Sequence, residues 1–185
     1  MYIKLIRHSK PAHKKVVKWC IRLFQKQLQM TIQQLEAILK DYITSSEKFQ
    51  IQKTIFANEG GREIYNETIR QNVQANSFGI YIWINTENQE VIYIGMAGKI
   101  KSSGALCSHT LCNRLIASRG KDKLTKKDIL TNDYVKSYME INNVNVLDYC
   151  IYYTNEGEPP SYVEALLLYN FYKINKRLPK LNNAF

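Results

Sequence analysis

The sequence is poor in cysteine, proline and glycine, and it contains no long apolar run. Its four cysteines (Cys20, Cys107, Cys112 and Cys150) lack the spacing of a disulfide framework, which suits a reducing compartment. Neither a low-complexity linker nor an internal repeat interrupts the chain. No stretch approaches the roughly 18 apolar residues of a membrane span, and no secretory signal opens the sequence. We therefore expect a cytoplasmic protein with no membrane partner.

What the chain does have is apolar residues and basic charge. Hydrophobic residues make up 45% of its 185 residues, which is typical of a globular protein of one or two domains. The formal net charge is +10, of which residues 1–75 carry +7 and residues 76–185 carry +3. A basic excess favours a polyanionic partner, because binding to phosphates releases counterions.

Much of the positive charge lies on one predicted helix, from about Pro11 to Tyr42, with a break near Met30-Thr31. Apolar residues recur there at intervals of three and four, which indicates a helix with one buried stripe. Basic residues crowd its first half: Lys10, Lys14, Lys15, Lys18, Arg22 and Lys26. This helix is equally consistent with DNA contact and with a packed helix whose polar face is solvated.

Residues 78–95 form the most informative stretch, two runs of β-branched and aromatic residues around a polar connector. This pattern predicts an antiparallel hairpin. We expect Tyr81 opposite Tyr93, a turn with an odd number of residues centred on Glu87, and both phenols on one face. Gly79-Ile80-Tyr81 and Tyr93-Ile94-Gly95 resemble the two triplets of the GIY-YIG nuclease family, which lie on the first two strands of a small sheet.

The resemblance covers about residues 77–183 and implies a set of catalytic residues. Tyr93 would be the general base that activates water, and Tyr81 would orient the water or the phosphate. Arg114 would clamp the phosphate, Glu164 would bind Mg²⁺ or Mn²⁺, and Asn182 would bind phosphate or steady the tyrosine. The family often has lysine after the second triplet, where this chain has Met96. Lys99 or Lys101 would substitute, and Arg119 is an alternative to Arg114 in substrate binding.

Residue chemistry gives these assignments independent support. Guanidinium binds phosphate through two parallel hydrogen bonds, and one carboxylate with waters and phosphate oxygens is an acceptable Mg²⁺ shell. Each residue also has an ordinary interpretation: the tyrosines as packed core residues, Arg114 as a solvated surface residue and Asn182 as a loop residue. Asn183 is an alternate for the asparagine position of the family. Ser161 and Glu164 have the spacing of a capping box. Cys107, His109 and Cys112 could supply three zinc ligands, but free thiols fit the spacing better.

The remaining pattern predicts short helices at 46–57 and 62–74, a helix from Ser108 or Thr110 to Ser118, and helical pieces over 121–136. A strand is expected at 144–154, a helix at 161–175 and an extended segment at 178–183. The predicted fold is α/β (α+β): a small, mainly antiparallel three-stranded sheet flanked by helices. A helical, basic N-terminal region (1–76), which would contact DNA or dimerise, precedes the nuclease-like domain (77–185).

The sequence thus predicts a metal-dependent endonuclease that hydrolyses DNA phosphodiester bonds. Its compact size resembles that of restriction endonucleases, which commonly act as homodimers. Two alternatives stay open: a repair or mobile-element nuclease of the same family, and a nucleic-acid-binding module that has lost catalysis.

Overall fold

The computed structural model describes residues 29–57, 59–106, 109–121, 125 and 127–183, and shows a mixed α/β fold. A four-stranded antiparallel sheet has the order β1-β6-β2-β3, and β4 and β5 form a separate pair. The strands are β1 (Ile43–Gln52), β2 (Gly79–Asn85), β3 (Glu90–Ala97), β4 (Ser118–Lys121), β5 (Asp128–Leu130) and β6 (Val146–Thr154). The helices are α2 (Ile32–Leu39), η2 (Lys53–Ala57), α3 (Gly61–Asn72), α4 (Leu111–Ile116), α5 (Thr131–Ile141) and α6 (Pro160–Asn175).

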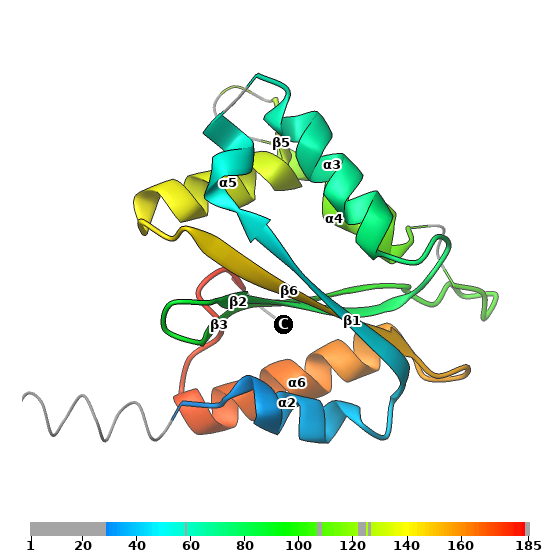
Figure 1. The fold of residues 1–185 in the computed structure, drawn as a ribbon. Helices are drawn as coiled ribbons and strands as arrows, with labels where there is room; N and C mark the ends of the chain where they lie inside the picture. Colours follow the sequence, from blue (N-terminus) through cyan, green and yellow to red (C-terminus); the bar gives the residue numbers. More distant parts are fainter. Residues whose placement is uncertain (1–28, 58, 107–108, 122–124, 126, 184–185) are drawn as a thin grey trace, which may run out of the picture.

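Helices cover both faces of the four-stranded sheet (Figure 1). Side chains alternate along β2, so Ile80, Ile82 and Ile84 pack in the lower cluster beneath the sheet, with α2 and α6. Tyr81 and Trp83 point the other way, into the upper cluster shared with α3, α4 and α5. The alternation of the sequence therefore places an aromatic face on an apolar one, and every residue of β2 is buried.

A β-bulge sets the register of the β2–β3 hairpin. Trp83, not Tyr81, lies opposite Tyr93, while Tyr81 lies opposite Gly95. The predicted register and odd turn are therefore wrong, because four residues connect Asn85 to its partner Glu90. The shift between Trp83 and Ile84 leaves one extra residue in β3, so Ile92 and Tyr93 both enter the upper cluster. The predicted shared face for the two phenols is confirmed, since one extra residue offsets the even turn.

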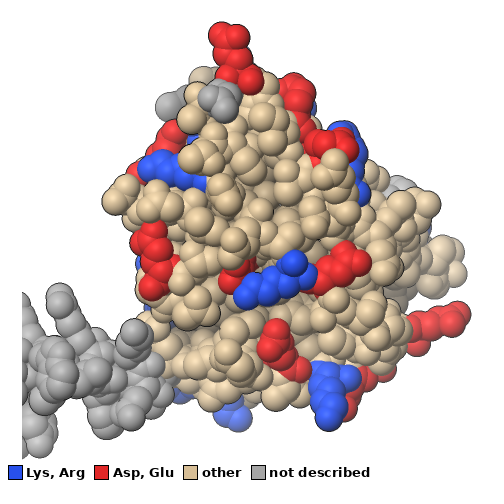
Figure 2. Space-filling view, viewed as in Figure 1, with Lys and Arg blue, Asp and Glu red and all other residues tan. Residues whose placement is uncertain are grey.

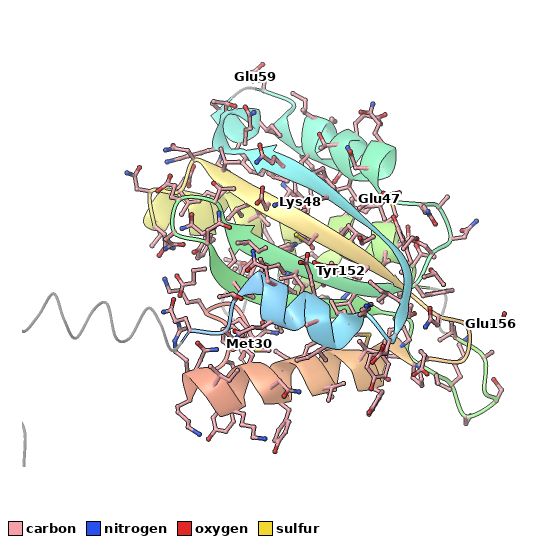
Figure 3. All side chains as sticks on the ribbon, turned by 60° about the horizontal axis from the view of Figure 1, so that its bottom comes forward. Met30, Glu47, Lys48, Glu59, Tyr152 and Glu156 are labelled. Atoms are coloured by element: carbon pink, nitrogen blue, oxygen red, sulfur yellow. The ribbon has the colours of Figure 1, made fainter. Side chains whose placement is uncertain are left out.

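The edge strand β1 corrects the prediction of a helix at 46–57. It pairs with β6 from Ile43 opposite Thr154 to Gln52 opposite Val146, and only the end of the segment forms a short helix, η2. Ion pairing and hydrogen bonding fasten β1 and α2 to β6 (Figure 3): Lys48 Nζ lies 2.7 Å from Asp148, and the Tyr152 hydroxyl donates to Glu36 at 2.9 Å. The sheet thus has one strand more than predicted, and it spans the expected division at residue 76.

Most other predicted elements are confirmed within a residue or two, namely α3, α4, β6 and α6. α2 begins at Ile32, directly after the predicted break at Met30-Thr31, and Thr31 caps it in a capping box with Gln34. The part of the predicted helix before the break, up to residue 28, lies outside the described residues. Residues 121–136, predicted as helical pieces, instead contain the end of β4, β5 and the start of α5. Residues 179–182 form a turn rather than an extended segment, with the Asn182 backbone N–H donating to the Pro179 carbonyl.

The six basic residues of the predicted first helix, Lys10 to Lys26, lie outside the described residues, so their choice between DNA contact and a solvated face stays open. On the face of the described part shown in Figure 2, basic and acidic side chains are interspersed and most of the surface is uncharged. This face therefore presents no continuous basic patch. In the same part of the chain, none of the helices has both the length and the apolarity to cross a bilayer.

Candidate active site

Tyr81 and Tyr93 form a pair on the upper face of the sheet, with ring centroids 5.6 Å apart. Gly95 lies beneath them. A Cβ atom at this position would come within 2.5 Å of Tyr93 Cε1 and 2.6 Å of Tyr81 Cζ. Gly79 is required for a different reason, since a Cβ there would collide with the Tyr152 carbonyl oxygen of β6. At Gly79 and Gly95, neighbouring atoms therefore occupy the space that a Cβ atom would need.

Both phenols are deeply buried, Tyr81 at 1% and Tyr93 at 7% exposure. Burial raises the pKa of Tyr81 far above its ordinary value, and the neighbouring Tyr93 raises it further. The positive charges of Arg119 and Arg114 oppose this rise in the pKa of Tyr81. Two guanidinium groups therefore act on the same buried tyrosine.

Arg114 lies at a solvent-accessible hollow of about 180 Å³. Its helix α4 begins at Leu111, with the Thr110 side chain accepting the Asn113 backbone N–H as an N-cap. The hollow is lined by the end of β3, the following loop and α4: Met96, Ala97, Gly98, Lys99, His109 and Arg114. The predicted phosphate clamp and one predicted substrate-binding lysine therefore line the same hollow.

Glu164 belongs to this group of charges although α6 covers the opposite face of the sheet. Burial raises the pKa of its carboxyl group to about 6, and the positive charges of Arg114 and Lys99 partly oppose that rise. The capping-box interpretation is wrong, because Pro159 is the N-cap residue of α6 and no side chain caps that helix. Glu164 also has no hydrogen bond or ion pair to another residue of the described part. A half-buried carboxylate without such partners is a suitable ligand for a cation.

Arg119 lies over the aromatic rings of the upper face. Its guanidinium carbon is 4.3 Å from the ring centroid of Tyr93, 4.7 Å from that of Tyr134 and 5.2 Å from that of Trp83. It extends from β4 and not from the end of a helix, which stops at Ile116. Of the two arginines considered from the sequence, Arg119 is in ring contact with Tyr93, and Arg114 lines the hollow.

Asn182 is a structural partner of β3. Its side-chain Oδ1 accepts the Ile94 N–H at 2.9 Å, and its Nδ2 donates to the Ile94 carbonyl at 2.7 Å. The Leu181 N–H donates to the Ile92 carbonyl at 2.9 Å, which extends this pairing along the edge strand. Asn182 therefore fixes the backbone directly between Tyr93 and Gly95. The expected role of steadying the tyrosine fits this geometry better than phosphate binding, whereas Asn183 is exposed.

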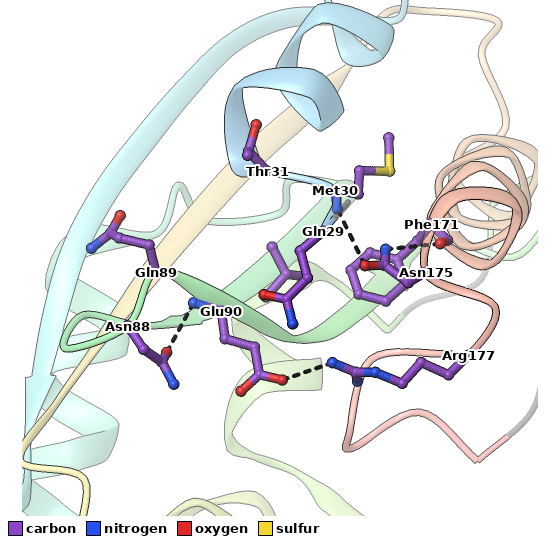
Figure 4. Close-up of a pocket in the computed structure, with 10 residues that line it drawn as sticks. Gln29, Met30, Thr31, Asn88, Gln89, Glu90, Phe171, Asn175 and Arg177 are labelled. Carbon is purple, nitrogen blue, oxygen red and sulfur yellow. Dashed lines mark hydrogen bonds and ion pairs between the residues drawn. The ribbon is translucent and has the colours of Figure 1, made fainter. Parts of the chain in front are cut away.

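The opposite end of the hairpin is fixed to the C-terminal segment by charge (Figure 4). Glu90 forms ion pairs with Arg177 at 2.9 Å and with Lys180 at 2.8 Å. Nearby, the Met30 N–H donates to the Asn175 side chain at 3.2 Å, beside a cavity of about 100 Å³. These contacts place the segment leading to Asn182, and the cavity has no lining residue in common with the hollow at Arg114.

The described residues contain no cluster of three or more His, Cys, Asp or Glu side chains arranged to hold a metal ion. A cation at Glu164 would therefore take its other ligands from water and from substrate oxygens. Of the zinc-ligand candidates, Cys107 lies outside the described residues, His109 lines the hollow and Cys112 packs against the upper cluster. Lys101 is exposed in the loop that follows the hollow.

Sequence reasoning missed three residues that help to form the site. Trp83 and Tyr134 complete the rings around Arg119, and His109 had been considered only as a zinc ligand. Trp83 could have been found from its alternation with Tyr81, whereas Tyr134 lies in a charged stretch with no such signal. No protein-family model, curated protein or solved structure matches the chain.

Proposed function

We propose that the protein is a divalent-metal-dependent endonuclease that hydrolyses DNA phosphodiester bonds, of the kind that the GIY and YIG triplets suggest. One observation carries the proposal. Arg119 on β4 stacks on the Tyr93 ring of β3, both Arg119 and Arg114 oppose the raised pKa of Tyr81, and Arg114 with Lys99 opposes the raised pKa of Glu164 on α6. Arg114 and Lys99, which act on Glu164, also line the solvent-accessible hollow. Ordinary core packing does not require two arginines beside a buried tyrosine pair.

The proposed roles follow from position and chemistry. Arg114 holds the scissile phosphate, because a guanidinium stays charged and binds two phosphate oxygens at once. Tyr93, ionised to the phenolate, would accept a proton from the attacking water and become the neutral phenol, and Tyr81 orients the water or the phosphate. Asn182 positions Tyr93 through the backbone of Ile94. Glu164 would hold Mg²⁺ or Mn²⁺, which stabilises negative charge on phosphate oxygens when bound.

A second candidate function is favoured by the burial of the phenols. A phenol with a pKa near 10 is a poor base at neutral pH, and Tyr81 is further disfavoured by burial. A module that binds nucleic acid without cutting it would retain the arginines and need no ionisable phenol. Cleavage would require a bound metal ion to add cationic charge near the tyrosines, beside that of the arginines.

The test is nicking of supercoiled plasmid DNA in Mg²⁺, Mn²⁺ and EDTA. Wild-type protein should nick the plasmid only with metal, while Arg114→Gln and Glu164→Gln should lose at least about 100-fold in rate, as expected for removal of a transition-state charge contact. Arg62→Gln on α3 and Glu156→Gln in the loop before α6 are matched controls, because both side chains are exposed. Binding without cleavage in either metal would favour the binding module.

The same experiment addresses the restriction-type proposal, in which two copies of the chain cut both strands. A homodimer should convert supercoiled plasmid to linear DNA at defined positions, whereas a monomer should accumulate nicked circles. Sequencing the ends of a digested DNA library would give the specificity and the cut geometry together. Random cut positions would contradict a restriction-type enzyme without contradicting nuclease activity.

A further inference from the structure

Arg119 is held in a fixed position by three aromatic rings. Trp83 and Tyr93 pack against each other beneath it, with ring centroids 4.7 Å apart, and both belong to the rigid sheet. Tyr134 on α5 supplies the third ring, and its hydroxyl donates to the Leu181 carbonyl at 3.4 Å. Because the rings are fixed by the sheet and by the C-terminal segment, the guanidinium plane has little freedom to move.

Within the described part of the chain, the guanidinium has ring partners but no polar ones. The structure shows no hydrogen bond or ion pair from Arg119 to any described residue, whereas Arg177 pairs with the Glu90 carboxylate. Stacking uses the faces of the guanidinium and leaves its N–H groups, which point outward in the plane, without a described partner. A half-buried cation of this kind is ready to bind an anion with little further loss of side-chain freedom.

Arg119 serves a different position from Arg114. The positive charges of both arginines oppose the raised pKa of Tyr81, although Arg119 extends from β4 and Arg114 from α4. Only Arg114 lines the hollow with Lys99 and His109, while Arg119 lies over the Tyr93 ring. We propose that the ring-bound Arg119 is an anchor for a second DNA backbone phosphate, distinct from the scissile phosphate at Arg114. Naming DNA as the source of the phosphate rests on the proposed function.

The salt dependence of DNA binding tests this anchor. A variant that neutralises one phosphate fewer should have a slope of log K against log salt that is shallower by about 0.9. Binding of a short duplex in Ca²⁺, measured by fluorescence anisotropy, should show this change in Arg119→Gln and in Arg114→Gln, and about twice the change in the double variant. Arg119→Lys should keep the slope but bind more weakly, because lysine neither stacks nor forms a fork. The exposed Arg62→Gln is the control.

Either of two results would overturn the proposal: a wild-type slope in Arg119→Gln, or a double variant with the slope of a single one. If Arg119→Gln fails to fold by circular dichroism, Trp83 carries the test. A Trp19→Phe variant leaves Trp83 as the single tryptophan, buried 5.2 Å from Arg119. Saturating DNA should then change its emission, and unchanged emission would exclude an anchor there. If the protein binds no DNA, the proposed function fails. Tripolyphosphate is then titrated into the same Trp19→Phe variant: a change in the emission of Trp83 would support an anion site at Arg119, and unchanged emission would exclude it.

Discussion

Replacing Glu164 with glutamine should make the protein more stable at alkaline pH and inactive as a nuclease. Burial raises the pKa of this carboxyl group from 4.5 to about 6 in the folded protein. A raised carboxyl pKa means that the folded state binds the proton more tightly than the unfolded state does. The resulting stability is fully present below pH 4.5 and is lost as the pH rises through 6.

The magnitude follows from the pKa difference. A change of one pKa unit corresponds to about 1.4 kcal/mol, so ionising Glu164 in the folded protein costs on the order of 2 kcal/mol. Glutamine has nearly the same shape but no charge to desolvate. The variant should therefore match the wild type near pH 4 and exceed its free energy of unfolding by up to about 2 kcal/mol at pH 8.

The assay is urea unfolding followed by circular dichroism from pH 4 to pH 8. The exposed Glu156→Gln should show no such pH-dependent gain and serves as the control. Adding Mg²⁺ should reduce the advantage of the variant, because a cation that binds only the folded, ionised carboxylate stabilises it by about 1.4 kcal/mol at ten times its Kd. A wild-type protein as stable as Glu164→Gln at pH 8 in EDTA would refute the reasoning.

Two further predictions concern the positioning of Tyr93. Gly95→Ala should displace both tyrosine rings, which a new Cβ would meet at 2.5 and 2.6 Å, and should cost about 1–3 kcal/mol of overpacking together with cleavage activity. Gly104→Ala, where a Cβ meets nothing within 4 Å, should lose about 1–2 kcal/mol through its positive φ but keep activity; equal losses of activity in both variants would contradict the close approach at Gly95. Asn182→Ala should cost about 1–3 kcal/mol in thermal unfolding, because it leaves the Ile94 N–H and C=O without their side-chain partner, whereas the exposed Asn183→Ala should cost nothing measurable. A larger effect at Asn183 would mean that the two asparagines had been assigned in the wrong order.

The local sequence pattern was sufficient to predict the features that depend only on neighbouring residues in the chain. Alternation along β2 predicted which face receives Tyr81 and which receives Ile80, and the cap at Thr110 predicted the start of α4. The register of β3 could not be read from the sequence, because an even turn combined with one bulge gives the same facing as an odd turn without a bulge. The predicted shared face was therefore right although the predicted pairing was wrong.

Elements that depend on distant partners were the ones missed. The segment 46–57 has about the same apolar content as the whole chain, so its composition does not separate a helix from a strand, and β1 forms there because β6 offers an edge to pair with. The placement of Arg119 depends on Trp83, Tyr93 and Tyr134 meeting from three elements, which no spacing along the chain encodes. The contribution of Asn182 likewise became specific only when its partners proved to be the backbone groups of Ile94.

The position of β6 has a consequence for how the chain folds. β6 lies between β1 and β2 in the sheet, yet it is the last strand in the sequence, and its hydrogen bond from Gln50 to Asp148 spans 98 residues. Until residues 146–154 leave the ribosome, β1 has no neighbour and one side of β2 is unpaired, and such edges invite association between nascent chains. The complete sheet must wait for this late strand to insert, so folding should be slow for the size of the protein.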